Sequence, residues 1–435
     1  MNRIKDNSDD RLRQLVMKEL PVRYPEQDDN LNLMVERELS IIATHNLASD
    51  FLLHKDLVIW AQNQKIPIDS ICRYSPSSLI NYILGITSVD PISFGLHFES
   101  FWNPLRKKSP TVMIDVGYSW REAVINHLEE LYGVDNVAVG TNSKSSSEKG
   151  CCNDSLSKLA IRPEVIRTSQ LAVVVSMPGT MELRPRYKNA ESTHGEVQLT
   201  EAQAIDLGAS IVIITESEVL ARLATIVQRL NDYGMKINLD TIPLVDERTM
   251  QLFRECNTEG VLLFEEANLK RLLVEICPNS FEDLMLIYTV CYPGMQAFIP
   301  DIALAKKTMI IPTHGCLEFD AILSNSYGQM IYKEQAVQIL HDVFGFGFDM
   351  SYVISRSLSG RITPNKKKVI EEFKMNAKNK GIDHKVWLGL LNYIEGRTNY
   401  TFSKAVMAAS VKIAWNSAFL KAHYPEAYSD CNSFT

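Results

Sequence analysis

The chain has 435 residues, of which 46% are hydrophobic and 22% are charged, and its formal net charge is −7. This composition is typical of a globular protein with two or three domains, and it excludes a disordered or fibrous chain. No apolar run approaches the ~20 residues that span a bilayer, and the N-terminus has no apolar leader, so we expect a cytoplasmic protein without membrane contact.

The acidic balance excludes a protein that wraps nucleic acid by overall charge alone, although a local basic groove remains compatible with it. Basic residues gather at 106–108 and again between 361 and 385. The second run is equally compatible with a solvated helix face. The eight cysteines contain no C-x-x-C pair, so we interpret them as reduced thiols.

In the first half, helical spacing of apolar residues predicts helices at 31–44, 51–62 and 77–84, with a short extended segment at 66–68. The β-branched run 110–116 predicts a strand. Ser119 and Glu122 are spaced as a capping box, and the helix that they begin should end at Gly133. This order predicts a strand, a turn and a helix.

Residues 141–157 are rich in serine and read as a loop. The continuous apolar runs 171–175 and 211–214 are typical of buried strands. From about residue 240 the chain is mainly helical, with helices predicted at 281–290, 333–344, 366–380, 386–395 and 403–422. An α/β region is therefore followed by a mainly α region.

Many short motifs occur in an order that resembles one known family. In the first half they are Glu36-Arg37-Glu38-Leu39, Leu84-Gly85-Ile86-Thr87, Asp90-Pro91 and Asn103-Pro104. In the second half they are Phe281-Glu282-Asp283-Leu284, Pro293-Gly294, Tyr332-Lys333-Glu334-Gln335 and Lys421-Ala422-His423-Tyr424-Pro425. Together they resemble the palm and fingers of the alpha subunit of bacterial DNA polymerase III, the C-family DNA polymerases.

The resemblance implies an α/β palm, nucleotidyltransferase-like with a mixed sheet and helices, followed by a mainly α fingers domain. We expect residues 1–134 to form the first part of the palm and 135–195 a reduced thumb-like or linking region. Residues 196–235 would return to the palm, and 236–435 would form the fingers. The resemblance also implies a chain without the family's PHP domain and without the regions that follow its fingers.

Polymerase chemistry requires two divalent cations held by several carboxylates. The family carries two of these ligands in a Pro-Asp-x-Asp-x-Asp strand, which corresponds here to 110–115, so that the ligands fall on Met113 and Asp115. The third ligand falls on Ile213. Glu216 is the nearest carboxylate, but three residues along a strand it should face the other way. Asp115 is therefore the one family carboxylate that is retained.

The motifs that handle nucleotides differ as well. The Gly-Arg-Gly-Ser loop is replaced by 71–74, where Arg73 lies one place from the family arginine, and the paired arginines are replaced by Tyr352 and Val353. The remaining candidates for binding nucleotide or DNA share a basic side chain. They are Arg73, Arg356, Lys366, Lys367 and Lys404.

Three hypotheses follow. The first is a polymerase relative without catalysis that binds DNA or assists replication or repair proteins. The second is an active DNA polymerase whose metal site combines Asp115 with Glu216 and further carboxylates, and Mg²⁺ is expected as a cofactor only in that case. The third is a protein-interaction scaffold that does not bind DNA.

Overall fold

The computed structural model describes residues 8–66, 68–69, 75–106, 112–117, 120–140, 170–176, 194–197, 203–204, 208–358 and 366–432. The contacts between residues divide the chain into two compact units. Unit 1 comprises residues 1–92 and 108–237, and unit 2 comprises 93–107 and 238–435. Each unit is therefore assembled from two separate stretches of sequence.

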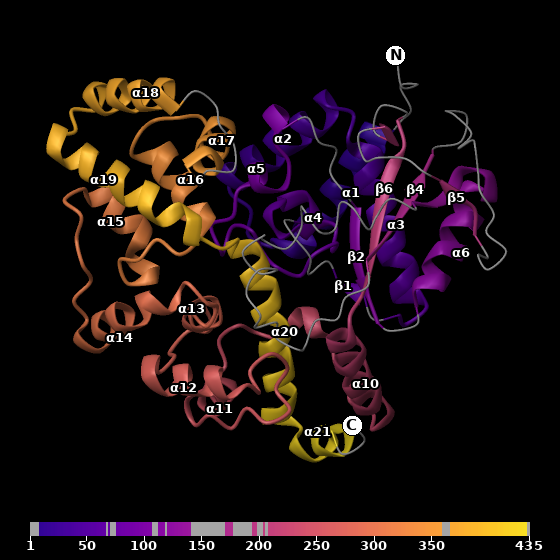
Figure 1. Ribbon diagram of the computed structural model, residues 1–435. Helices are drawn as coiled ribbons and strands as arrows, with labels where there is room; N and C mark the ends of the chain where they lie inside the picture. The colour runs from indigo at the N-terminus through magenta and orange to yellow at the C-terminus, as the bar shows by residue number, and fades with distance from the viewer. Residues whose placement is uncertain are drawn as a thin grey trace. The chain divides into compact units, whose positions relative to one another are not determined.

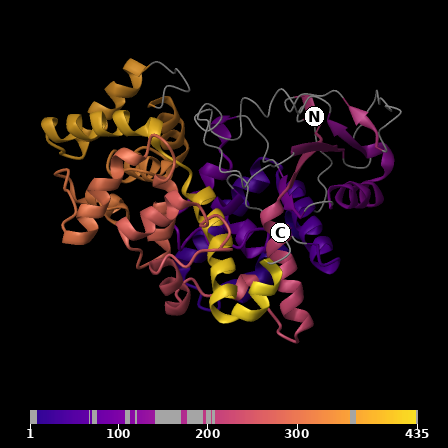
Figure 2. The same cartoon turned by 60° about the horizontal axis from the view of Figure 1, so that its bottom comes forward.

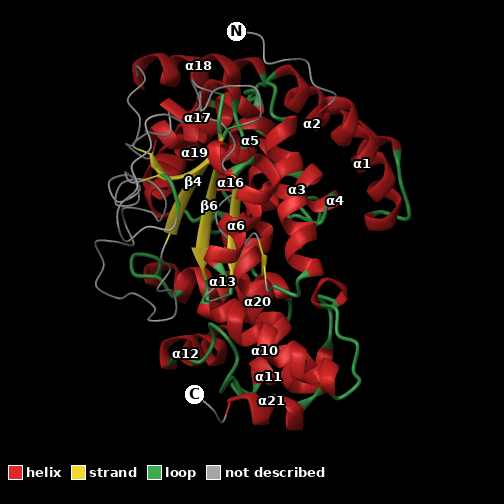
Figure 3. Cartoon of the chain, turned by 90° about the vertical axis from the view of Figure 1, so that its right-hand side faces the viewer, coloured by secondary structure: helices red, strands yellow, loops and turns green. Residues whose placement is uncertain are grey.

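Unit 1 combines helices with a mixed sheet, shown with strands in yellow in Figure 3. Its helices are α1 (Ser8–Arg23), α2 (Asp29–Thr44), α3 (Ala48–Asn63), α4 (Leu79–Ile83), α6 (Arg121–Tyr132) and α10 (Glu218–Asp232). Its strands are β1 (Ile68–Asp69), β2 (Val112–Val116), β3 (Val137–Gly140), β4 (Gln170–Val175), β5 (Glu196–Val197) and β6 (Ser210–Glu216). The predicted α/β palm with a mixed sheet is confirmed.

The described strands follow the order β1-β2-β6-β4-β3-β5. β2 runs parallel to β6, whereas β4 runs antiparallel to both β6 and β3. One face packs against α3 and α6, where Leu53, Leu57 and Val124 meet Ile114 and Val212. The range 135–195, predicted as a reduced thumb-like or linking region, contributes β3 and β4 to this sheet.

Helices make up most of unit 2. They are α5 (Phe98–Phe101), α11 (Glu247–Arg254), α12 (Ala267–Ile276), α13 (Phe281–Val290), α14 (Ile299–Thr308), α15 (Leu317–Leu323), α16 (Lys333–Asp342), α17 (Phe348–Leu358), α18 (Lys366–Asn379), α19 (His384–Arg397), α20 (Lys404–His423) and α21 (Pro425–Asn432). The predicted mainly α region is confirmed, and Figure 1 labels these helices.

Helix α20, drawn in yellow in Figures 1 and 2, buries residues on every side of the helix. Trp415 is fully buried and stacks near Phe253, with ring centroids 6.2 Å apart. Its indole nitrogen donates to the Pro243 carbonyl at 2.8 Å. A helix without a polar face requires neighbours on all sides. In unit 2, α11 and α13 pack directly against it.

Candidate functional site

The predicted ligand positions lie side by side in the sheet of unit 1. In the parallel register of β2 and β6, Met113 is opposite Ile213, and Asp115 is opposite Thr215. Side chains alternate along a strand, so these four share one face of the sheet. The alternate residues point to the other face, into the core formed with α3 and α6; they are Ile114, Val116, Val212 and Ile214. The register thus places Ile213 beside Met113 and Asp115, the three positions on which the resemblance placed metal ligands.

This face offers little to a divalent cation. Asp115 is 2% exposed and is the single carboxylate among these four residues, and Asp69 of β1 stands opposite it in the antiparallel register. Met113 contributes a thioether, Ile213 an alkyl group and Thr215 a hydroxyl, whereas Mg²⁺ requires several oxygen ligands. Within the described part of the chain, no cluster of three or more His, Cys, Asp or Glu could hold a metal ion. Met113 and Ile213 therefore do not fit as ligands of a two-metal site.

Glu216 belongs to the opposite face of the sheet. It is paired in the register with Val116, which is part of the core that packs against α3 and α6. Its carboxylate makes an ion pair with Arg121, the first residue of α6, at 3.6 Å. The alternation along β6 therefore directs Glu216 away from Asp115, as the strand geometry predicts.

A buried histidine lies behind Met113. His54 on α3 is 4% exposed, and its imidazole is hydrogen-bonded to the backbone of Met113. Burial lowers the pKa of His54 to about 4, against the opposing effect of that hydrogen bond. Its Nε2 has no hydrogen-bond partner among the residues that the structure describes. We therefore expect a neutral imidazole that supports β2 from the side of the core.

Lys404, a candidate for binding phosphate, directs its ammonium inward within unit 2. The Nζ donates to the carbonyl oxygen of Phe94 at 2.6 Å and lies 5.9 Å from the ring centroid of Tyr332. Burial lowers the pKa of Lys404, although Glu334 and Glu282 act in the opposite direction. At least one of its three donors is therefore occupied by the protein itself.

The other basic candidates are less closely defined. Arg356 lies on α17 and is partly buried. Lys366 and Lys367 begin α18, where the structure describes their backbone only. Arg73 and the Ser119 cap lie outside the described residues. In unit 2, Arg356, Lys366 and Lys367 stand on two different helices, and no described contact joins them into one basic site.

The Tyr-Lys-Glu-Gln motif stabilises the N-terminal end of α20 in unit 2. Glu334, from the Tyr-Lys-Glu-Gln motif, is 3% exposed and accepts from the Ser403 hydroxyl at 3.1 Å and from the Lys404 amide at 2.7 Å. It thereby caps the N-terminus of α20. Gln335 accepts from the amides of Ile331 and Tyr332, both at 3.0 Å. These residues therefore satisfy backbone donors within unit 2.

The Lys-Ala-His-Tyr-Pro motif has a comparable role at the other end of α20. Lys421 Nζ donates to the Asn257 carbonyl at 2.8 Å, to the Asn257 Oδ1 at 2.9 Å and to the Glu259 carbonyl at 2.8 Å. His423 lies 3.0 Å from Asp246, the residue that caps α11. Burial lowers the pKa of Lys421. The motif therefore joins α20 to the segments around α11.

Buried carboxylates from two further motifs are also engaged. In unit 1, Glu38 accepts from the Ser78 hydroxyl and the Leu79 amide, both at 2.9 Å, and so joins α2 to α4. In unit 2, Asp283 pairs with Lys306 and accepts from the Tyr327 hydroxyl at 2.8 Å. Glu38 and Asp283 therefore each hold segments of their own unit together through polar contacts.

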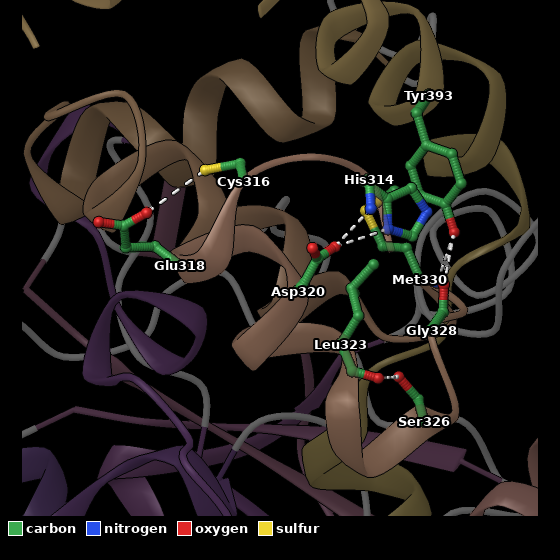
Figure 4. A network of polar contacts seen from close by, with 9 residues as sticks. All are labelled: His314, Cys316, Glu318, Asp320, Leu323, Ser326, Gly328, Met330 and Tyr393. Carbon is green, nitrogen blue, oxygen red and sulfur yellow. Dashed lines mark hydrogen bonds and ion pairs between the residues drawn. The ribbon is translucent and has the colours of Figure 1, made fainter. Parts of the chain in front are cut away.

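A separate polar network surrounds His314, between α14 and α15 (Figure 4). Asp320 accepts from the His314 amide at 2.8 Å and lies 3.0 Å from the His314 Nδ1. The imidazole packs edge-on against Tyr393, with centroids 4.7 Å apart, and the Tyr393 hydroxyl donates to the Gly328 carbonyl at 3.2 Å. The network fixes the loop before α15 to α19. Cys316 points away from His314, toward Glu318.

These features define a nucleotidyltransferase-type palm followed by helical fingers, and comparison with known proteins assigns them to a family. Residues 10–217 match the bacterial DNA polymerase III alpha NTPase domain, and residues 218–381 match the bacterial DNA polymerase III alpha subunit finger domain. The chain belongs to the bacterial DNA polymerase III alpha family. The resemblance inferred from the sequence motifs is thereby confirmed.

Individual relatives agree with this assignment. The chain is 27% identical over 478 residues to the DNA polymerase III subunit alpha of Halalkalibacterium halodurans, covering 97% of this chain and 43% of the relative. It is 26% identical to that of Neisseria meningitidis, covering 94% and 40%, respectively. The chain thus spans about two-fifths of the length of these relatives. Among the described helices, none has the length and hydrophobicity to cross a membrane.

Proposed function

We propose that this chain is a polymerase palm and fingers that does not catalyse nucleotide addition and acts in the cytoplasm as an accessory to DNA replication or repair. The observation that carries the proposal is the register of Met113 with Ile213 beside Asp115. A thioether and an alkyl group cannot replace two of the carboxylates that clamp the divalent cations, and phosphoryl transfer depends on that clamp.

The pattern of retention supports the same proposal. Glu38, Glu334 and Lys421 all satisfy donors or acceptors inside their own unit. Selection for a stable fold keeps the residues that stabilise it, even in a protein that no longer catalyses a reaction. DNA binding is part of the proposal because the family relatives are named as DNA polymerase subunits.

Primer extension tests the loss of catalysis. The purified chain is incubated with a primed template, the four deoxynucleotides and either Mg²⁺ or Mn²⁺, beside an Asp115→Asn variant. We expect no extension from either protein. Extension that disappears in the variant would overturn the proposal and favour an active enzyme with carboxylates recruited from elsewhere, including Glu216.

DNA binding is tested separately by titrating labelled single-stranded and primed DNA at two salt concentrations. Contacts with phosphate release counterions, so affinity should fall steeply as salt increases. We expect such binding, and a variant with Lys366→Gln and Lys367→Gln should show a shallower salt dependence. Absence of binding at low salt would contradict the DNA-binding part of the proposal.

A protein-interaction role is the second candidate, and an exposed apolar segment in unit 2 favours it. Met309, Ile310 and Leu317 are 83%, 73% and 86% exposed, respectively. Large apolar side chains gathered on a surface often mark contacts with other proteins. Replication or repair proteins would be the expected partners. Serine substitutions at Met309 and Ile310 should weaken such a complex, and unchanged DNA binding would distinguish the two roles.

A further inference from the structure

His194 connects the edge of the sheet in unit 1 to helix α6 through both of its ring nitrogens. Nδ1 lies 3.0 Å from Glu129 Oε1, and Nε2 lies 2.8 Å from Glu122 Oε2. The imidazole side chain is 8% exposed, whereas Glu129 and Glu122 are 16% and 60% exposed. Strand β5 begins at Glu196, two residues after His194.

The chemistry of these groups makes the arrangement sensitive to one proton. An ionised carboxylate accepts hydrogen bonds but cannot donate, whereas a neutral imidazole has one donor and one acceptor nitrogen. Both contacts therefore form together only when the ring carries two protons. After the loss of one proton, a nitrogen lone pair would face a carboxylate oxygen, and the two would repel.

We propose that His194 is a proton-operated latch, whose imidazolium holds residues 194–197 against α6 and whose deprotonation releases the contact with Glu122. Glu122 is the partner that separates because it is mostly exposed and can turn into water. Glu129 is largely buried and keeps the remaining N–H. The proton leaves to solvent, and no other bond changes. This latch goes beyond the proposed function and does not depend on it.

The latch controls a defined piece of the sheet. β5 pairs in parallel with β3, and the Val139 amide donates to the Gly195 carbonyl at 2.8 Å, one residue from His194. β5 is the last strand in the sheet order, so no described strand covers its outer side. A short edge strand with few hydrogen bonds is easily displaced, and an anchor at its start changes how often it opens.

The surrounding charges are consistent with this role. On α6, Arg121 is held by Glu216, and Glu130 faces His127. Strand β3 carries only apolar residues and glycine, and β4 carries no titratable residue. Nearby, Asp135 precedes β3 and Glu196 follows the ring on its own strand. Among the residues that the structure describes, Glu122 and Glu129 are the carboxylates that contact the imidazole.

The direction of the pKa supports the geometry. Burial alone would lower the pKa of His194, but the hydrogen bonds with Glu122 and Glu129 outweigh it and raise the pKa above its ordinary value of 6.5. A raised pKa means that the latched form is fully present below pH 6.5 and is lost as the pH rises through the folded value. Release therefore falls above pH 6.5.

Hydrogen exchange measured by mass spectrometry on the full chain tests the latch. Protection factors for the peptide that contains Val139 are compared between about pH 6 and pH 9, so that the intrinsic pH dependence of exchange is removed. For the wild-type chain, we expect protection to fall about two- to fivefold across this range, the value of one exposed ion pair. The change should follow a single titration.

Three variants make the test specific. His194→Gln should abolish the pH dependence. Glu122→Gln should also abolish it, because an amide can donate to the unprotonated Nε2 and keep both contacts at high pH. His127→Gln on the same helix is the matched control and should retain the wild-type profile. Since Glu122 is mostly exposed, its variant should fold even if His194→Gln does not. A pH-independent wild type, or a Glu122→Gln variant with the wild-type profile, would overturn the latch.

Discussion

Met113 of β2 lies opposite Ile213 of β6. Two residues further along the same strands, Asp115 lies opposite Thr215. Two apolar side chains thus occupy neighbouring places on adjacent strands, about 5 Å apart. The resemblance in sequence predicts that the family carries aspartates at these two places. The predicted change therefore affects both strands of one face.

Restoring the two aspartates should create a metal site. A variant with Met113→Asp and Ile213→Asp would add two carboxylates to Asp115 on this face, beside the register position of Asp69 and within the reach of one or two cations. We expect Mn²⁺ binding in electron paramagnetic resonance titrations of this variant, competed by Mg²⁺ and abolished by adding Asp115→Asn. Without metal, three buried carboxylates repel one another, so the variant should unfold at a lower urea concentration.

The wild-type chain is the control for that experiment. It should show no Mn²⁺ binding that depends on Asp115. If Asp115→Asn removes a binding site from the wild-type chain, then carboxylates from elsewhere complete the site and the interpretation of Met113 and Ile213 as lost ligands is wrong.

His54 should make the chain sensitive to mild acid. Its folded pKa of about 4 lies below the ordinary value of 6.5, so the unfolded chain takes up a proton first as the pH falls. The free energy of unfolding should therefore decrease by about 2 kcal/mol from about pH 7.5 to about pH 5. Urea unfolding at several pH values measures this slope.

A His54→Gln variant separates this effect from other titrations. The test compares the slope of stability with pH, so a change in the overall stability of the variant does not affect it. We expect a distinctly shallower slope than in the wild type. An identical slope would show that His54 is not the group that titrates.

Removal of the cap on α20 should destabilise unit 2. Glu334→Ala leaves the buried Ser403 hydroxyl and Lys404 amide without their acceptor, which costs about 1–3 kcal/mol each in comparable sites. Thermal unfolding should report the loss. Glu371→Ala, on the exposed side of α18, is the matched control and should change stability by less than about 0.5 kcal/mol. Equal effects would contradict the capping role.

Lys404→Met should affect stability more than DNA affinity. The substitution keeps the aliphatic stem but removes the donor to the Phe94 carbonyl, which should lower the free energy of unfolding by about 1–2 kcal/mol. Fluorescence anisotropy with labelled DNA should give a nearly unchanged Kd. Lys374→Met, on the exposed face of α18, is the contrasting control and should leave stability intact. A large loss of affinity in Lys404→Met alone would favour the phosphate-binding role predicted from the sequence.

Most of the fold was predictable because the chain carries strong local patterns. The apolar runs at 171–175 and 211–214 became β4 and β6, and the helix at 281–290 was predicted with the observed bounds of α13. The segment of α1 was not predicted, since Pro21 lies within it and its apolar spacing is weak. Strand β3 was missed because four residues carry too little periodicity to identify a strand.

The candidate site was predictable only in part. Sequence spacing identified Met113 and Asp115 as neighbours on one face, whereas their alignment with Ile213 required the register of β2 and β6. The roles of Glu38 and Glu334 as buried caps could not be predicted, because their partners lie 40 to 70 positions away. A carboxylate's neighbours across such distances depend on tertiary packing rather than on local sequence. The same holds for His194 and its partners on α6.

The separation of residues 93–107 from the rest of unit 2 has a consequence for synthesis on the ribosome. Phe94 supplies the carbonyl for Lys404, and Asn103 donates to the Asp349 carbonyl at 3.0 Å. Because the chain emerges from its N-terminus, this short segment leaves the ribosome hundreds of residues before those partners do. Unit 2 cannot be completed until α20 has been translated, and a fragment starting at residue 238 would never acquire these contacts.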